Sequence, residues 1–215
     1  MRNVIAFVGN YGSGKTELSL NTAHAWRSQG KKVLVVDLDI VNPYFRSSER
    51  KNELEQREIE IITPVYANTN VDAPMVSPMV GGSFQRSEYD LILDVGGDPV
   101  GAKALGTYRH VFQEQKGQLY FVINAYRPLT NTAGNIMTML EQVQSSCGMK
   151  ADGLINNSNL SFETTPAQVL HGLELVKQVS KATGIPILYS SGMESTLEGV
   201  PGQTFAIQRQ MELKL

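Results

Sequence analysis

The sequence predicts an α/β fold of three layers, in which helices cover both faces of a mostly parallel β-sheet. Short apolar runs alternate with segments of helical periodicity along the chain, which is the pattern of repeated βαβ units. Several of these runs are continuous Val, Ile and Leu, as in strands that are buried on both faces. With 215 residues, 41% of them hydrophobic, residues 1–215 are expected to form a single domain.

The same patterns place the individual elements. Strands are expected at 3–8, 32–37, 58–63, 89–94, 118–124, 153–156 and 186–189. Helices are expected at 15–29, 101–114, 132–146 and 165–184. The last helix has the clearest start, because Thr165, Pro166 and Gln168 supply an N-cap, a first-turn proline and a capping box.

Charge and cysteine content disfavour several kinds of protein. Lys and Arg total 19 against 21 for Asp and Glu, so a nucleic-acid-binding surface is not expected. Cys147 is the single cysteine and cannot form an intramolecular disulfide or a cysteine-rich metal cluster. The apolar run at 4–9 is too short for a signal sequence or a membrane span, and the tail at 204–215 is too weakly patterned for an anchor. A cytoplasmic protein without stable membrane insertion is therefore expected.

Two stretches do not fit the alternation. Residues 46–60 are rich in charges of both signs, which is typical of a solvated helical face. Residues 68–86 combine prolines, methionines and a glycine pair, and we expect a connector that packs apolar residues on the core.

The strongest functional signal is the stretch from Gly9 to Thr16, which matches G-x-x-x-x-G-K-[ST] between an expected strand and an expected helix. Backbone N–H groups of such a loop converge on phosphates at the helix N-terminus, where side chains on the glycines would block their approach. Lys15 is therefore expected to reach the β- and γ-phosphates, and Thr16 to hold Mg²⁺. The expected nucleotide-binding residues of this loop are Gly9, Asn10, Tyr11, Gly12, Ser13, Gly14, Lys15, Thr16 and Glu17.

Carboxylates at the ends of two expected strands complete the site. Asp94 is expected to bind Mg²⁺ through water, while the N–H of Gly97 in the following turn senses the γ-phosphate. Asp37 and Asp39 lie two residues apart and so on the same side of their strand end. We expect Asp37 to support the metal shell and Asp39 to orient the attacking water. Turn capping is the structural alternative for all three aspartates.

These motifs resemble those of the SIMIBI class of P-loop NTPases, and most closely the MinD/ParA-like ATPases with their CobQ/CobB/MinD/ParA nucleotide-binding domain. The resemblance extends over about residues 1–200. It implies a parallel sheet between helices, hydrolysis of a Mg-nucleotide and often a homodimer that encloses the nucleotide. By this resemblance, Asp39 corresponds to the water-activating aspartate of switch I, and the segment from Asp94 to Gly97 corresponds to switch II.

The chain also departs from this family. Asn10 stands where MinD/ParA-like proteins usually carry a second, signature lysine that reaches across the dimer. Cys147 alone cannot supply the two cysteines with which iron–sulfur members bridge a cluster. A homodimer therefore stays an open alternative rather than an implied state.

The segment from Asn156 to Asn159 follows an expected strand where similar GTPases carry N-K-x-D, whose aspartate pairs with guanine. An Asn amide can donate and accept, as adenine requires, so Asn156 or Asn157 is expected to contact adenine, with turn formation as the alternative. Residues 190–192 are expected to help close this pocket. Asp152 and Glu163 are acids that could take the guanine-binding role instead.

The expected function is that of a Mg-dependent ATPase that changes conformation with its nucleotide and acts on a protein partner of unknown identity. Residues 40–46, which include two aromatic side chains, are expected to form a switch exposed to the partner in one nucleotide state. The alternatives are a GTPase of the metallochaperone type, a small-molecule kinase or ligase similar to dethiobiotin synthetase, and a nucleotide-binding scaffold without hydrolysis.

Overall fold

The computed structural model describes residues 2–39, 54–63, 78–97 and 99–210. The strands are β1 (Val4–Val8), β2 (Val33–Leu38), β3 (Ile59–Ile62), β4 (Asp90–Val95), β5 (Gln118–Ile123), β6 (Gly153–Asn156), β7 (Ile187–Gly192) and β8 (Thr204–Ala206). The α-helices are α1 (Lys15–Ser28), α3 (Pro78–Ser83), α4 (Pro99–Gly106), α5 (Arg109–Glu114), α6 (Ala133–Cys147) and α7 (Pro166–Thr183). Short 3-10 helices are η2 (Pro128–Thr130), η3 (Ser161–Glu163) and η4 (Glu194–Thr196).

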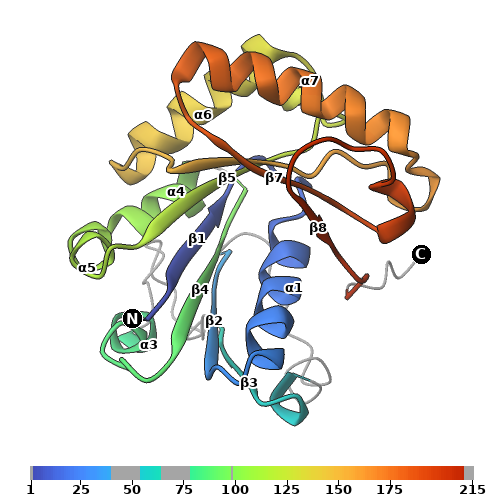
Figure 1. Cartoon of the computed structure of the whole chain (residues 1–215). Coiled ribbons are helices and arrows are strands. Elements are labelled where there is room, and N and C mark those ends of the chain that lie inside the picture. The colour runs from blue at the N-terminus through green and yellow to red at the C-terminus, as the bar shows by residue number, and fades with distance from the viewer. Residues whose placement is uncertain (1, 40–53, 64–77, 98, 211–215) are drawn as a thin grey trace, which may run out of the picture.

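The strands form one 8-stranded sheet with the order β3-β2-β4-β1-β5-β6-β7-β8. Every neighbouring pair in this sheet is parallel. Figure 1 shows α1 on one side of the sheet, and α6 and α7 on the other. The three-layer α/β fold expected from the sequence is confirmed.

Alternate residues of the central strands face opposite layers. In β4, Leu91 and Leu93 join the core under α3, α4, α6 and α7, whereas Ile92 joins the core under α1. Because side chains alternate along a strand, Asp94 falls on the α1 side. The same alternation in β2 places Asp37 there too. The sheet thus directs both carboxylates toward the helix that follows the glycine-rich loop.

The helix expected at 101–114 is two helices, α4 and α5, which are separated at Thr107 and Tyr108. Gly106 ends α4 where it approaches α6, and a Cβ there would lie 3.1 Å from the backbone of Cys147. Tyr108 stacks on Phe84, with ring centroids 5.7 Å apart. The expected helix is therefore divided because Gly106 has poor helix propensity and because the ring of Tyr108 is held by a tertiary contact.

The strand expected at 186–189 extends to Gly192, and β8 follows it as a strand that the sequence analysis did not predict. The extension occurs because Ser190 and Ser191 pair with Thr204 and Phe205. Residues 190–192, expected to follow the strand and help close the base pocket, therefore belong to β7 itself. A strand as short as β8 gives little periodicity from which to predict it.

The two irregular stretches are described only in part. Leu54 is buried and residues 55–58 are exposed, as expected for a solvated charged face. From Pro78 onward, α3 and the next turn pack Val80 and Phe84 into the core, as expected for a connector with apolar anchors. Residues 40–53 and 64–77 lie outside the described part of the chain.

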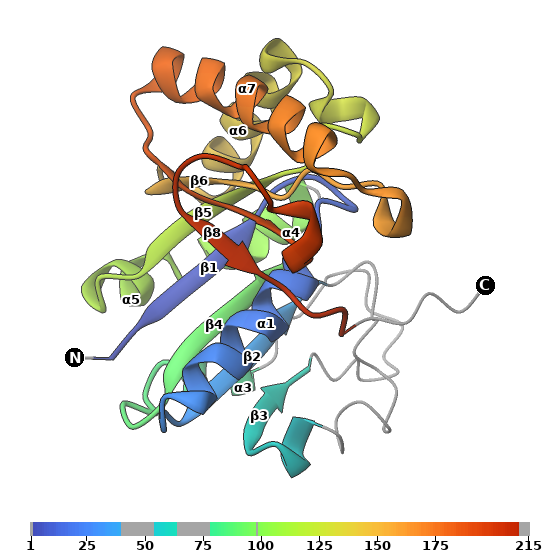
Figure 2. The ribbon, with the colours of Figure 1, turned by 45° about the vertical axis from the view of Figure 1, so that its right-hand side comes forward.

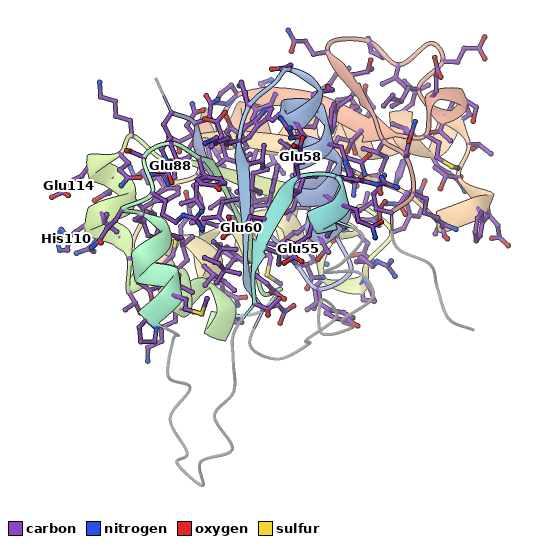
Figure 3. The ribbon with its side chains drawn as sticks, turned by 90° about the horizontal axis from the view of Figure 1, so that it is seen from below. Glu55, Glu58, Glu60, Glu88, His110 and Glu114 are labelled. Atoms are coloured by element: carbon purple, nitrogen blue, oxygen red, sulfur yellow. The ribbon has the colours of Figure 1, made fainter. Side chains whose placement is uncertain are left out.

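Charged side chains surround the amino-terminal edge of the sheet, which Figure 3 shows from below. Glu60 pairs with Arg86, and Glu88 lies 3.8 Å from the same guanidinium. Asp90 accepts a hydrogen bond of 2.6 Å from the N–H of Asn3. These three carboxylates thus have partners within the fold. Among the described helices, none is long and apolar enough to cross a membrane.

Candidate nucleotide-binding site

The loop between β1 and α1 has a conformation that requires glycine. Gly9, Gly12 and Gly14 have φ angles of 143°, 70° and 91°, which residues other than glycine rarely adopt. A Cβ on Gly14 would also lie 2.2 Å from the amide nitrogen of Asn157. Glycine at this position lets the chain turn directly into α1. The first N–H groups of the helix then lie at its N-terminus, as in helices that bind phosphates there.

Lys15 folds back over this loop. Its side chain is buried, and its ammonium group donates to the carbonyl oxygens of Gly9 at 3.2 Å and Asn10 at 3.0 Å. Oδ1 of Asn10 accepts a hydrogen bond of 2.8 Å from the N–H of Tyr11. The asparagine at the signature-lysine position therefore stabilises the loop of its own chain.

A hydrogen bond of 2.7 Å from the hydroxyl of Thr16 to Oδ2 of Asp94 connects the first turn of α1 to the end of β4. Asp94 is 2% exposed, and its Oδ1 has no hydrogen-bond partner among the residues that the structure describes. A buried oxygen without a partner is unfavourable, and carboxylate and hydroxyl oxygens are ligands that suit Mg²⁺. Thr16 and Asp94 therefore fit the metal ion that the family implies.

Burial raises the pKa of the Asp94 carboxyl to about 6, and the negative charge of Asp39 acts in the same direction. The hydrogen bond from Thr16 and the positive charge of Lys15 lower the pKa and offset part of the burial effect. The ionised form of Asp94 is thus unfavourable in the protein alone, and a cation at this position would stabilise it.

Asp37 and Asp39 lie where β2 ends. Asp37 is directly opposite Asp94 in the register of β2 and β4, and its Oδ1 accepts a hydrogen bond of 2.8 Å from the N–H of Asp39. Oδ1 of Asp39 lies 3.2 Å from the position of a Cβ on Gly96. Asp37 thus forms the turn that was considered as an alternative, and the metal and water roles stay predictions. The switch expected at 40–46 lies outside the described residues.

Backbone atoms of the loop after β4 pack directly on the phosphate-binding loop. A Cβ on Gly97 would lie 2.6 Å from the backbone N and Cα of Tyr11. In the same way, a Cβ on Gly101 would lie 2.6 Å from Cα of Gly96. A displacement of the loop after β4 must therefore move the phosphate-binding loop, and the reverse, since no side chain separates Gly97 from the backbone of Tyr11.

Asn157 supports the loop from the other side. Its Nδ2 donates a hydrogen bond of 2.7 Å to the carbonyl oxygen of Ser13, and its Oδ1 accepts one of 2.9 Å from Ser191. The residue is 2% exposed. Asn157 therefore joins the P-loop to β6 and β7, a role that the sequence analysis missed, and its contact with adenine stays a prediction.

The other residues considered for the base site are directed elsewhere. Asn156 is fully buried, and its amide donates to the carbonyl oxygen of Val169 at 3.0 Å and to the hydroxyl of Ser190 at 3.1 Å. These bonds occupy both donor hydrogens, so a contact with adenine stays a prediction that would require them to rearrange. Asp152 accepts a hydrogen bond of 2.7 Å from the N–H of Leu119, at the amino ends of β5 and β6. It lies at the wrong edge of the sheet to bind a base.

Arg127 joins the site although it was not among the expected site residues. Its Nε donates a hydrogen bond of 2.9 Å to the carbonyl oxygen of Gly12, and its side chain is exposed. Its position agrees with a place beside the phosphates, because Arg127 follows β5, the neighbour of β1 on the side opposite β4. Ligands of such sheets bind where the strand order reverses, at the carboxyl ends of the strands.

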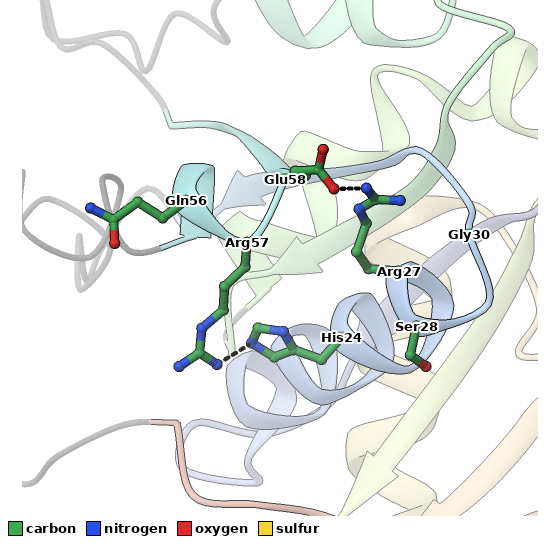
Figure 4. Close-up of a pocket in the computed structure, with 7 residues that line it drawn as sticks. All are labelled: His24, Arg27, Ser28, Gly30, Gln56, Arg57 and Glu58. Carbon is green, nitrogen blue, oxygen red and sulfur yellow. Dashed lines mark hydrogen bonds and ion pairs between the residues drawn. The ribbon is translucent and has the colours of Figure 1, made fainter.

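A separate pocket of about 430 Å³ lies at the C-terminal end of α1. Arg27 forms an ion pair with Glu58 there, and Nη1 of Arg57 lies 3.4 Å from Nε2 of His24. The P-loop lies at the opposite end of the helix, so this pocket is distinct from the nucleotide site. Figure 4 shows its lining residues, which are His24, Arg27, Ser28, Gly30, Gln56, Arg57 and Glu58.

Comparison with known families matches residues 5–182 to the CobQ/CobB/MinD/ParA nucleotide binding domain. The chain belongs to this family. The match confirms the resemblance found from the Gly9–Thr16, Asp37–Asp39 and Asp94–Gly97 motifs. None of the curated protein sequences compared with the chain matches it.

Solved structures of FtsY proteins are similar in fold. The cell division protein FtsY of Thermotoga maritima superposes with a TM-score of 0.59 at 18% identity, covering 91% of this chain and 64% of its own. Chloroplast FtsY of Physcomitrella patens gives 0.61 at 17% identity, covering 91% and 61%. The signal recognition particle receptor FtsY of Elizabethkingia anophelis, in complex with GDP, gives 0.55 at 18% identity, covering 89% and 57%. The chain thus spans less than two thirds of these FtsY chains.

The raised pKa of Asp94 predicts a pH-dependent stability. The value of about 6 in the folded protein exceeds the ordinary 3.8, so the native state binds more protons between these values, and stability falls as pH rises through about 6. Asp94→Asn removes this effect. In urea unfolding without nucleotide, the variant should exceed the wild type at pH 8 by up to about 3 kcal/mol, and by less toward pH 4. Glu141→Gln, at an exposed position, should show no such gain, and a less stable Asp94→Asn at pH 8 would contradict the argument.

The close approach of Gly97 to Tyr11 predicts that Gly97→Ala weakens nucleotide binding, because the new methyl group must displace one of the two loops. Overpacking typically costs about 1 to 3 kcal/mol, so calorimetry should show a loss of about five- to 150-fold in affinity for Mg-ATP. Gly82→Ala is the matched control, since no heavy atom lies within 4 Å of the added Cβ. Equal affinities of the two variants would argue against coupling of the loops.

Proposed function

We propose that the protein is a Mg-dependent nucleoside triphosphatase that binds ATP and uses its hydrolysis to switch its interaction with a protein partner. Membership of a nucleotide-binding family supports the binding step. The observation that carries the proposal is the hydrogen bond between Thr16 and Asp94, because it joins the P-loop hydroxyl to a strand-end carboxylate with an oxygen left for a metal ion.

The proposed reaction assigns one task to each group. Lys15 and the N–H groups at the start of α1 bind the phosphates. Thr16 and Asp94 would hold Mg²⁺, and the bound ion would neutralise charge on the phosphates. Asp39 accepts a hydrogen bond from the attacking water and orients it toward the γ-phosphorus. Attack of the water breaks the bond between the γ-phosphorus and the bridging oxygen, and releases ADP, phosphate and a proton.

The exposed side chains beside the P-loop support the proposal of a protein partner. Tyr11 is 62% exposed and Leu129 is 58% exposed, and both lie at the carboxyl ends of neighbouring strands. Arg127, two residues before Leu129, donates a hydrogen bond to the carbonyl oxygen of Gly12, which follows Tyr11. Exposed large apolar side chains with an arginine are typical of binding surfaces. Because Tyr11 also contacts Gly97, a partner here, including a second copy of the chain, would sense the state of the phosphate site.

Asp39→Asn tests the hydrolytic part of the proposal. The amide keeps the size of the side chain but is a weaker acceptor for water, so phosphate release should fall by about 10²-fold or more, as expected for a group that acts in the transition state. Affinity for Mg-ATP should stay within a few-fold, whereas Lys15→Ala should lose binding. Hydrolysis by Asp39→Asn at the wild-type rate would remove Asp39 from the mechanism, and unchanged binding by Lys15→Ala would remove the site.

Several observations bear on the choice between adenine and guanine. The segment from Asn156 to Asn159 offers no carboxylate, and Asp152 lies at the opposite edge of the sheet, which supports adenine. Glu163, in η3 after β6, is an acid on the correct side, and it supports guanine as the second candidate. One of the FtsY structures similar in fold is a complex with GDP.

Competition between ATP and GTP should show preference for ATP. Without an acid that accepts from the guanine N–H groups, buried donors stay unpaired at about 1 to 3 kcal/mol each, which corresponds to about five- to 150-fold weaker GTP binding. The measurement is displacement of a fluorescent nucleotide in the presence of Mg²⁺. A preference for GTP that Glu163→Gln abolishes would instead establish the guanine candidate.

A further inference from the structure

The strand order determines where the nucleoside of a bound nucleotide must lie. In the proposed reaction, Asp39 and Gly97 face the γ-phosphate, and they follow β2 and β4 on one side of β1. The phosphates then pass over the N-terminus of α1. The nucleoside must therefore lie on the other side of β1, toward the carboxyl ends of β6, β7 and β8.

The C-terminal strap, defined here as residues 207–210, lies at that end of the site. Figure 2 shows the chain after β8 crossing the N-terminal part of α1. The buried Asn21 clamps the strap, because its Nδ2 donates to the carbonyl oxygen of Gln208 and its Oδ1 accepts from the N–H of the same residue, both at 2.8 Å. One turn nearer the P-loop, the carboxylate of Glu17 accepts a hydrogen bond from the N–H of Gln210. The strap is therefore fixed next to Thr16.

The other side of the strap reaches η3. The guanidinium of Arg209 lies 3.4 Å from the centroid of the Phe162 ring and donates to the hydroxyl of Ser161. Phe162 is 74% exposed, and the left-handed backbone of Ser161, with φ of 61°, precedes it. A large aromatic ring is thus presented to solvent at the nucleoside end of the site, with a flat cation stacked on it.

We infer that the C-terminal strap and Phe162 form the outer wall of the nucleoside site, where the base of a purine nucleotide stacks on the Phe162–Arg209 pair. Every base has a π-face, and aromatic and guanidinium groups bind such faces without regard to the hydrogen-bonding edge. The pair therefore contributes affinity for the nucleoside, and the choice between adenine and guanine is made elsewhere. This inference rests on the proposed function.

The strap also connects the nucleoside to the phosphate loop. Gln210 contacts Glu17, which follows Thr16 directly, and Arg209 contacts the loop that follows β6. Asn21 and Glu17 bind the strap to α1, and a base stacked on the Phe162–Arg209 pair would add a further contact to it. The inference predicts that phosphate binding alone does not require the strap.

The test compares Mg-ATP with inorganic triphosphate in calorimetry. Phe162→Ala and Arg209→Ala should each weaken Mg-ATP binding, by about five- to 150-fold for loss of a full stack, while triphosphate binds as to the wild type. Phe162→Trp should keep the wild-type affinity for Mg-ATP. Met79→Ala is the matched control, since this large apolar side chain is 53% exposed on α3, away from the site.

The outcomes separate this inference from the proposed function. If the wild type binds neither Mg-ATP nor Mg-GTP, the proposed function fails. If the wild type binds the nucleotide and Phe162→Ala binds it equally well, the inferred stacking of the base on Phe162 is wrong, and the proposed nucleotide site is unaffected. An equal loss of Mg-ATP and triphosphate in Phe162→Ala would show that η3 supports the P-loop, and would also overturn the inference.

Discussion

The hydrogen bond between Thr16 and Asp94 is the contact on which the candidate site depends, because it fixes the first turn of α1 against the end of β4. Alternation along β4 directs Asp94 to the α1 side, and a left-handed Gly14 lets α1 begin close enough to meet it. The bond leaves one carboxylate oxygen buried without a partner among the described residues, next to Asp37 on β2. The site thus concentrates negative charge where a cation is needed.

Close contacts on both sides of the P-loop hold the rest of the site. Gly97 touches the backbone of Tyr11, and Asn157 bonds the carbonyl oxygen of Ser13 from the opposite direction. The P-loop therefore lies between the loop after β4 and the end of β6, and neither side can move independently of it. The backbone contact between Gly97 and Tyr11 is a physical route by which occupation of the proposed phosphate site would reach the exposed surface around Arg127.

The sequence predicted the fold and the position of the glycine-rich loop between β1 and α1 because both follow local rules. Continuous apolar runs identify buried parallel strands, and the spacing of Gly9, Gly14 and Lys15 identifies the loop. The division of α4 from α5 depends on contacts of Gly106 and Tyr108 with distant elements, so local propensity did not reveal it. The inward direction of Asn156, the support from Asn157 and the strap over α1 likewise depend on tertiary pairing between segments far apart in the sequence.

The two edges of the sheet differ in how their polar groups are satisfied. At the amino edge, Glu60 and Asp90 have cationic or N–H partners within the fold, and these two carboxylates need no ligand. At the carboxyl edge, Asp94 is buried with a raised pKa, and Phe162 carries its ring in solvent. Each of these features is unfavourable for the protein alone, and in the proposed complex each would be relieved by a different part of one ligand: the metal-bound phosphates for the carboxylate, and a flat base for the aromatic ring. Asp94 at the end of β4 and Phe162 after β6 lie on opposite sides of β1. The two ends of a bound nucleoside triphosphate would lie on these same two sides.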